Sequence, residues 1–151
     1  MRLLLILLFL LITTVEAKDS ALVKYMSVQK VKAYIRSGPG NNYKVTKKVG
    51  KYTPFKALKR TNDGQWIKVE GYNGMLGWIN ASHLTNMPAV IVKTSEANVR
   101  KGPGRNYETI WKAVEGVPFR CLKRNGRWLR VLDVDDEVGW IYDALVWGIC
   151  Y

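Results

Sequence analysis

The chain of 151 residues has one histidine, His83, and two cysteines, Cys121 and Cys150. Cysteine catalysis needs a histidine base and an orienting polar group, and no motif links these three residues, so we expect no enzymatic activity. A zinc site usually needs about three or four histidine, cysteine or acidic ligands. The densest acidic residues lie between positions 133 and 137 and are interpreted as a charged turn. We therefore predict no metal site, and we predict no cofactor.

A long apolar run is present only at the N-terminus, over residues 3–12. Arg2 precedes this run, and Val15 and Ala17 suit the −3 and −1 positions of a cleavage site. This pattern is typical of a secretory signal peptide, residues 1–17, cleaved after Ala17. The run is shorter than the ~20 residues that cross a bilayer. We therefore expect an exported protein, periplasmic or extracellular after cleavage.

Export exposes the two cysteines to oxidising conditions, and an even number suits one disulfide bond. Cys121 shares one side of a predicted strand with Phe119, so its side chain is expected to point inward. Cys150 is the penultimate residue. Either a Cys121–Cys150 bridge ties the C-terminal tail to the domain, or the chain has two separate thiols.

Acidic residues are scarce: the chain has 12, against 24 lysines and arginines, for a net charge of +12. Residues 18–87 hold 13 basic and 3 acidic residues, whereas residues 88–151 hold 10 and 8. The first half is therefore the better candidate for contact with anionic surfaces. The alternative is a lysine-rich composition that serves solubility alone. Nucleic acid would suit lysines interleaved with tyrosines, but export argues against it.

An internal repeat organises the rest of the chain. Residues 33–43 match residues 97–107, and each segment contains Arg-x-Gly-Pro-Gly-x-x-Tyr. Trp66 then matches Trp128, and residues 77–79 match residues 139–141 as Gly-Trp-Ile. We predict two repeats, 28–84 (repeat one) and 90–147 (repeat two), joined by a short segment that contains a proline and holds them side by side.

Glycine and β-branched or aromatic residues favour short strands with tight turns. Each Gly-Pro-Gly is predicted to form a turn in which proline fixes φ and the glycines adopt conformations closed to other residues. Asn125-Gly126 indicates a tight hairpin. Several short strands in about 55 to 60 residues indicate a small closed barrel.

The order of these motifs resembles the bacterial SH3 domain family, often called SH3b. Repeat two is similar to it from Ala97 to Ile141. Repeat one departs at Tyr34, where the family usually has asparagine, and at Tyr52, where repeat two has Gly116. The resemblance implies an all-β fold of two tandem SH3-like barrels. It also implies extracytoplasmic modules that bind peptidoglycan or accompany wall-active enzymes, rather than modules that recognise proline-rich peptides.

Aromatic rings beside arginines can stack on a sugar ring or a peptide. Ligand contact is predicted for seven side chains in or near the repeated motifs: Tyr43, Trp66, Arg100, Arg105, Tyr107, Trp111 and Trp128. Three of these have alternatives. Trp66 and Trp128 could be core or half-core residues, and Trp111 could pack between the repeats.

The leading hypothesis is a non-catalytic exported module that binds peptidoglycan or another envelope polymer. Repeat two would supply an aromatic groove, and repeat one would add electrostatic adhesion to anionic surfaces. The alternative is an adaptor that positions or regulates a wall hydrolase, contacts another envelope protein or binds a host protein.

Overall fold

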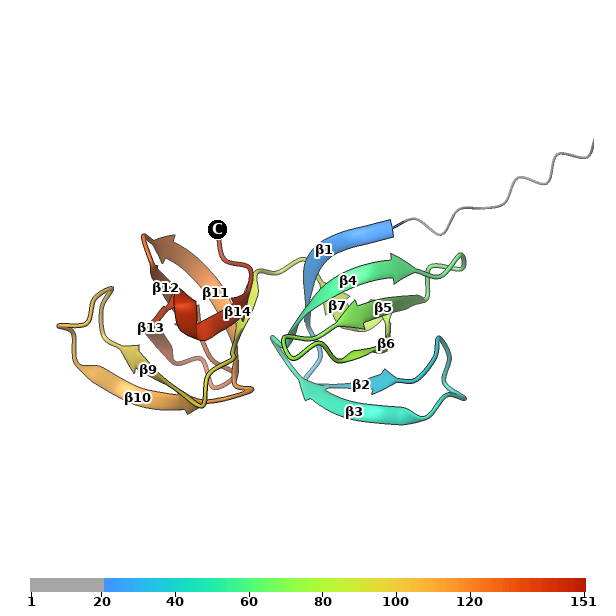
Figure 1. Ribbon diagram of the computed structural model, residues 1–151, viewed down its shortest axis with the longest axis horizontal. Helices are drawn as coiled ribbons and strands as arrows, with labels where there is room; N and C mark the ends of the chain where they lie inside the picture. The colour runs from blue at the N-terminus through green and yellow to red at the C-terminus, as the bar shows by residue number, and fades with distance from the viewer. Residues whose placement is uncertain (1–20) are drawn as a thin grey trace, which may run out of the picture.

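The computed structural model describes residues 21–151, which form two antiparallel β-sheets joined by a short linker (Figure 1). The predicted signal peptide, residues 1–17, lies outside the described residues. The first sheet contains β1 Ala21–Val28, β2 Lys32–Arg36, β3 Val45–Gly50, β4 Pro54–Arg60, β5 Trp66–Glu70, β6 Leu76–Asn80 and, after the 3-10 helix η1 Ala81–His83, β7 Leu84–Thr85. The second contains β8 Ala89–Val92, β9 Glu96–Arg100, β10 Thr109–Val114, β11 Pro118–Asn125, β12 Trp128–Leu132, β13 Val138–Tyr142 and, after η2 Asp143–Leu145, β14 Val146–Gly148.

The two sheets have the same strand order, β3-β2-β6-β5-β4-β1-β7 and β10-β9-β13-β12-β11-β8-β14. This confirms the predicted all-β fold and the duplication. The first sheet begins at Ala21, earlier than the predicted start of repeat one at Val28. The reason is that β1 pairs along β4 from Ala21↔Lys59 to Ser27↔Pro54 and also pairs with β7.

Each repeat has its own hydrophobic core, built by strands whose side chains alternate between interior and surface. In β12, Leu129 and Val131 are buried, and they pack with Phe119 of β11 and Ile141 of β13. Cys121 is 7% exposed, so its inward orientation is confirmed. Burial of one such side chain contributes about 1.5–3 kcal/mol, and each small core has only about a dozen of them.

The Gly-Pro-Gly turns form, but the reason predicted for their glycines is wrong. None of these glycines has φ in the left-handed region. Space is what excludes a side chain there: a Cβ added to Gly38 would lie 2.3 Å from the ring of Tyr43, and one added to Gly102 would lie 2.3 Å from the ring of Tyr107. The tyrosine that ends each motif therefore packs on the glycine that begins its turn.

A left-handed residue occurs instead at Tyr52 and Gly116, which match in sequence. Their φ angles are 68° and 85°. Their backbone N–H groups make equivalent hydrogen bonds, Tyr52 to the Val28 carbonyl and Gly116 to the Val92 carbonyl. Repeat one therefore has a buried tyrosine in a conformation that favours glycine. The duplicated hydrogen bond keeps this geometry despite the change of residue.

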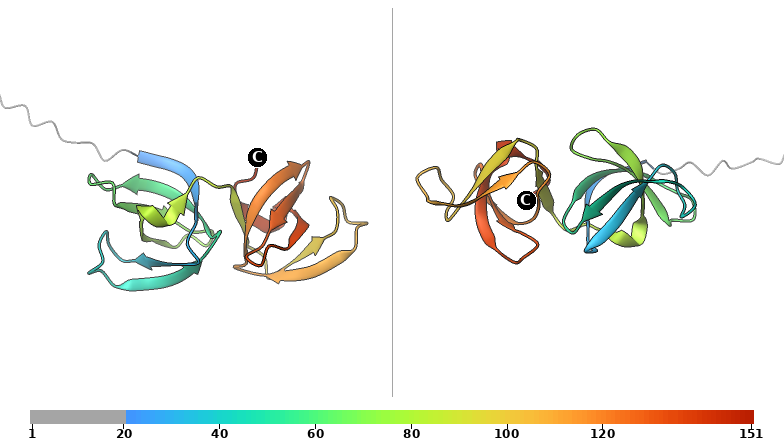
Figure 2. Two further views of the ribbon diagram at one scale, coloured as in Figure 1. Left: turned by 180° about the vertical axis from the view of Figure 1, so that it is seen from behind. Right: turned by 90° about the horizontal axis from the view of Figure 1, so that it is seen from below.

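The two barrels lie side by side, with the linker passing between them (Figure 2). The rings of Tyr25 and Trp147 meet edge to face with centroids 5.1 Å apart. The buried Ser27 hydroxyl donates a hydrogen bond to the Met87 carbonyl at 2.8 Å. Contacts between the repeats thus include β1, the linker and β14. Within residues 21–151, no helix is long and apolar enough to cross a membrane.

Candidate functional site

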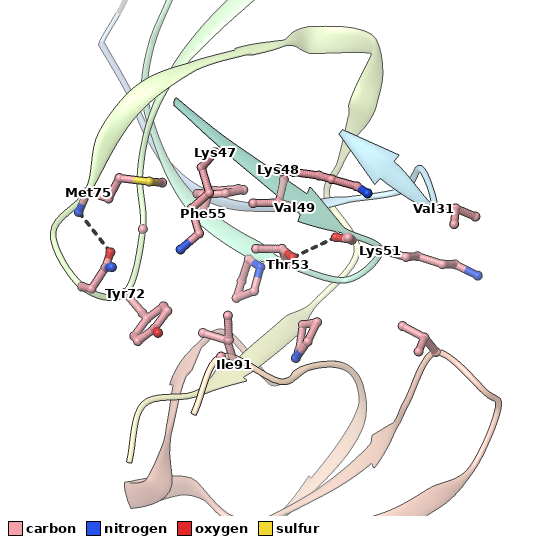
Figure 3. Close-up of a pocket in the computed structure, with 17 residues that line it drawn as sticks. Val31, Lys47, Lys48, Val49, Lys51, Thr53, Phe55, Tyr72, Met75 and Ile91 are labelled. Carbon is pink, nitrogen blue, oxygen red and sulfur yellow. Dashed lines mark hydrogen bonds between the residues drawn. The ribbon is translucent and has the colours of Figure 1, made fainter. Parts of the chain in front are cut away.

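A cleft of about 480 Å³ lies between the two repeats (Figure 3). Repeat one supplies most of its wall from β3, β4 and the turns beside them, and Figure 3 shows Ile91 of β8 on the opposite side. The apolar part of the lining consists of Val31, Val49, Pro54, Phe55, Met75, Ile91, Pro118 and Val134. A concave apolar surface between two domains is a common position for a ligand site.

Three lysines, Lys47, Lys48 and Lys51, also line this cleft, and no acidic residue lines it. Lys47 and Lys48 form no ion pair within residues 21–151, and the Lys51 ammonium lies 4.9 Å from the centroid of the Tyr52 ring. Because β3 is an edge strand, these lysines also discourage pairing with another chain. The cleft thus combines an apolar lining with positive charge at one side.

One contact across the repeats lies beside the cleft. The Tyr72 hydroxyl donates a hydrogen bond of 3.2 Å to Oε1 of Glu115 in repeat two. The pKa of Tyr72 lies above its ordinary value. Burial is the main cause, and this hydrogen bond and the charge of Glu115 add to it. Gly116 follows directly, and an added Cβ there would lie 3.8 Å from the Tyr72 hydroxyl. The turn before β11 therefore forms part of the contact.

A second surface lies on repeat two, around the ring of Tyr142. The guanidinium carbons of Arg105 and Arg127 lie 5.9 and 5.2 Å from the centroid of this ring, and the Trp128 ring lies 5.4 Å away. We call Arg105, Arg127, Trp128 and Tyr142 the Tyr142 cluster. The matching residues of repeat one are Asn41, Gln65, Trp66 and Asn80, so the cluster belongs to repeat two alone.

Arg100, another predicted ligand contact, binds its own turn. Its Nη1 donates a hydrogen bond of 2.9 Å to the Tyr107 carbonyl. Arg36 in repeat one does the same, donating 2.8 Å to the Tyr43 carbonyl. The arginine of the repeated motif thus holds the turn in place, and Tyr43 and Tyr107 remain at the surface, each 44% exposed.

The three predicted tryptophans have different environments. Trp66 is 7% exposed and presents little surface to a ligand. Trp128 is half-buried and joins the Tyr142 cluster. Trp111 is half-buried against the core of repeat two, and a Cβ on Gly139 would lie 3.4 Å from its ring. It therefore packs on its own barrel and not between the repeats.

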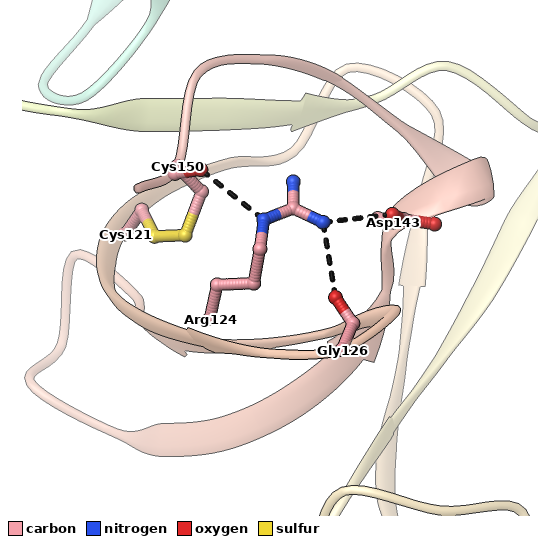
Figure 4. The surroundings of a disulfide bond; sticks show 5 residues. All are labelled: Cys121, Arg124, Gly126, Asp143 and Cys150. Atoms are coloured by element: carbon pink, nitrogen blue, oxygen red, sulfur yellow. Dashed lines mark hydrogen bonds and ion pairs between the residues drawn. A yellow bond between two sulfur atoms is a disulfide. The ribbon is translucent and has the colours of Figure 1, made fainter.

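Cys121 and Cys150 form a disulfide bond, with Cα atoms 5.5 Å apart (Figure 4). This separation lies within the usual range for a bridge. Cys121 therefore has no free thiol that could pair with His83, and His83 lies in η1 of the other repeat. No group of three or more histidine, cysteine or acidic residues within residues 21–151 could hold a metal ion.

Sequence reasoning missed the cleft and Tyr142. The cleft combines residues from both repeats, and its shape depends on how the barrels pack. A signal for Tyr142 was present, because the residue after Gly-Trp-Ile is asparagine in repeat one and tyrosine in repeat two. The sequence also showed a second difference, because Arg127 of repeat two matches Gln65 of repeat one.

The duplicated seven-stranded sheet and its motif turns define a tandem of small SH3-type barrels. The bacterial SH3 domain family matches residues 31–85 and, in a second form, residues 93–148. The chain belongs to this family and contains two of its domains in tandem.

Part of the chain is similar to a Bacillus subtilis (strain 168) protein named "Putative N-acetylmuramoyl-L-alanine amidase YrvJ". The two are 26% identical over an alignment of 123 residues, and the match covers 74% of this chain and 23% of that protein. The chain thus spans less than a quarter of that relative's length.

Two solved structures show a weaker likeness. An NlpC/P60 family protein from Bacillus cereus ATCC 10987 has 13% identity and a TM-score of 0.40, over 84% of this chain and 57% of that one. NlpC2 from Trichomonas vaginalis has 15% identity and a TM-score of 0.36, over 85% and 49%.

Proposed function

We propose that this chain is an exported, non-catalytic module that binds peptidoglycan in the cell envelope. The observation that carries the proposal is the cleft between the repeats, where an apolar lining and three lysines lie together. Peptide stems of peptidoglycan combine small apolar side chains with carboxylates. Such a segment would bury its methyl groups against Phe55 and Ile91 and place its carboxylates near Lys47 and Lys48.

The Tyr142 cluster would add a second contact on the same polymer. A partly exposed aromatic ring with two arginines suits the face of a sugar and a neighbouring carboxylate. The excess of basic residues in repeat one would strengthen adhesion to anionic wall polymers in a salt-dependent way. Any hydrolytic step would belong to another protein or domain. The name of the Bacillus subtilis relative supports this association with wall enzymes.

Co-sedimentation of residues 18–151 with purified peptidoglycan sacculi, at low and high salt, tests the proposal. We expect the protein to sediment at low salt. A Lys47→Glu/Lys48→Glu double variant should bind several-fold more weakly, because it reverses the charge of the cleft. Lys123→Glu/Lys112→Glu makes the same change of charge on repeat two, outside the cleft lining, and is the control.

Binding that survives high salt in the native protein, and falls in the cleft variant only, would support recognition in the cleft. Equal losses in both double variants would show that net charge alone drives adhesion. Absence of sedimentation at both salt concentrations would overturn the proposal in favour of a protein partner, which a pull-down with one stoichiometric partner would then identify.

A further inference from the structure

Arg60 and Arg124 occupy matching positions in the two repeats, but their surroundings differ. Figure 4 shows Arg124 held on three sides. Its Nε donates to the Cys150 carbonyl at 3.3 Å, and its Nη1 donates to the Gly126 carbonyl at 3.1 Å and to Oδ2 of Asp143 at 2.9 Å. The Asp143 carboxylate also accepts from Arg127. Repeat two thus supplies its own carboxylate to this arginine.

Repeat one keeps the arginine and lacks the carboxylate. Arg60 Nη1 donates to the Gly64 carbonyl at 2.9 Å, which reproduces the Arg124–Gly126 bond. Within the described part of the chain, this is the one hydrogen bond of the Arg60 side chain. Ala81 stands at the position of Asp143.

The backbone N–H at this position makes the same hydrogen bond in both repeats. The Ala81 N–H donates to the Gln65 carbonyl at 2.8 Å, and the Asp143 N–H donates to the Arg127 carbonyl at 2.9 Å. Ala81 and Asp143 therefore have matching backbone positions, although the turn before β5 has five residues, 61–65, and the turn before β12 has two, 126–127. Replacing an aspartate by alanine there leaves an open space in front of a guanidinium group.

That space is a hollow of about 490 Å³ on the surface of repeat one. It is lined by Arg60, Gly64, Gln65, Asn80, Ala81 and Ser82, none of which is acidic. The Gln65 side-chain amide can donate a hydrogen bond to an anion held by Arg60, whereas the Ser82 hydroxyl already donates to Oδ1 of Asn80 at 2.7 Å. The hollow therefore offers a positive charge from Arg60 and a neutral donor from Gln65.

We propose that this hollow binds a carboxylate from outside the chain, which takes the place that Asp143 fills in repeat two. A guanidinium group is always charged and binds a carboxylate through two parallel N–H···O bonds, so it suits this ligand. The inference goes beyond the proposed function, because the hollow is separate from both the cleft and the Tyr142 cluster. The carboxylate can come from a peptide or from a small organic acid.

Two-dimensional ¹H–¹⁵N NMR of residues 18–151 tests the proposal with three probes: sodium acetate, a peptidoglycan stem tetrapeptide with a free C-terminal carboxylate, and the same peptide with its carboxylates amidated. We expect the free peptide to shift the amide signals of Gly64, Gln65 and Ser82 in a saturable way, and the amidated peptide to leave them unchanged. Saturable shifts with acetate at similar concentrations would identify a site for any carboxylate, and shifts with the peptide alone would identify a site for a peptide.

Two variants locate the response. Arg60→Gln removes the charge, and Ala81→Asp fills the hollow with an internal carboxylate, as in repeat two. Each should weaken carboxylate binding at least about tenfold. The reciprocal variant Asp143→Ala should create a new response at Gly126. The spectra also report whether each variant is folded.

Absence of carboxylate-dependent shifts at Gly64 and Gln65 in the native protein would overturn the proposal. Shifts that persist unchanged in both folded variants of repeat one would also overturn it. Sedimentation with sacculi that remains intact in either case would show that the proposed function stands without this site.

Discussion

The ring of Tyr107 lies against Gly102, so that a Cβ on this glycine would fall 2.3 Å from ring atoms Cδ1 and Cε1. Tyr43 and Gly38 have the same relationship in repeat one. Since Arg100 also binds the Tyr107 carbonyl, the motif Arg-x-Gly-Pro-Gly-x-x-Tyr is a self-contained unit that packs a turn on its own tyrosine. The motif is therefore repeated because it stabilises the turn of each barrel, whether or not it contacts a ligand.

Gly102→Ala should destabilise the protein by about 1–3 kcal/mol, because the ring of Tyr107 must move off the turn. Denaturant unfolding followed by tryptophan fluorescence measures this effect. Gly50→Ala is the control, because its nearest atom would be 3.7 Å from the added Cβ and its φ is not left-handed. Equal stability of Gly102→Ala and the native protein would show that the tyrosine ring can move freely.

Reduction of the Cys121–Cys150 bond should destabilise repeat two by about 3–4 kcal/mol, as expected for a cross-link that closes a loop of about 30 residues. Thermal unfolding with and without reductant gives the value, and intact mass after alkylation reports the number of thiols. Cys150→Ser should unfold like the reduced protein and should not respond to reductant. Alkylation of two thiols without reductant would contradict the bridge.

The Asp143 carboxylate should make stability depend on pH. Burial favours its neutral form, but hydrogen bonds and charges from Arg127 and Arg124 outweigh this, and the pKa lies below its ordinary value of 3.8. The ionised group therefore stabilises the folded state above that pH, and the contribution disappears as the pH falls through the lower folded-state pKa.

Asp143→Asn should accordingly cost about 1 kcal/mol at neutral pH, because the arginines are partly exposed. Urea unfolding of both proteins between pH 7 and about pH 2 measures the difference. The two stability curves should converge in acid. A constant difference over the whole range would show that the charge of Asp143 is not the cause.

The contact between Tyr25 and Trp147 should fix the relative orientation of the repeats and thus the width of the cleft. Trp147→Ala removes an edge-to-face pair, typically worth about 0.5–1.5 kcal/mol beyond its buried area. NMR residual dipolar couplings should then change for one repeat relative to the other. Trp147→Phe keeps an aromatic ring and should change little. Identical couplings in Trp147→Ala and the native protein would mean that the linker and the remaining contacts, such as the Tyr72–Glu115 hydrogen bond, set the orientation.

Comparison of the repeats predicted most of the fold correctly. In strands such as β12, buried residues alternate with more exposed ones over five positions. Asn125-Gly126 leads into the tight turn between β11 and β12, in which Gly126 has a φ of 59°. Such information is local. The early start of β1 was missed because its partners, β4 and β7, are distant in the sequence.

The candidate site was predicted only in part. Arg105 and Trp128 do lie together, at the ring of Tyr142, whereas Trp66 is buried and Arg100 binds its own turn. Residue type alone does not distinguish a ligand contact from a packing contact. The sequence around an arginine beside a turn is the same whether its guanidinium group faces solvent or binds a carbonyl.

The sequence by itself determined the duplicated β-architecture, the bacterial SH3 family and the unequal charge of the two halves, because each is carried by residues close together in the chain. Only the tertiary structure decided that Lys47 and Lys48 line the same cleft as Ile91 of the other repeat. It also decided that Arg124 has a carboxylate partner while Arg60 faces an open hollow. Both results depend on contacts between distant segments, whose free energy is set by packing geometry that no local pattern encodes.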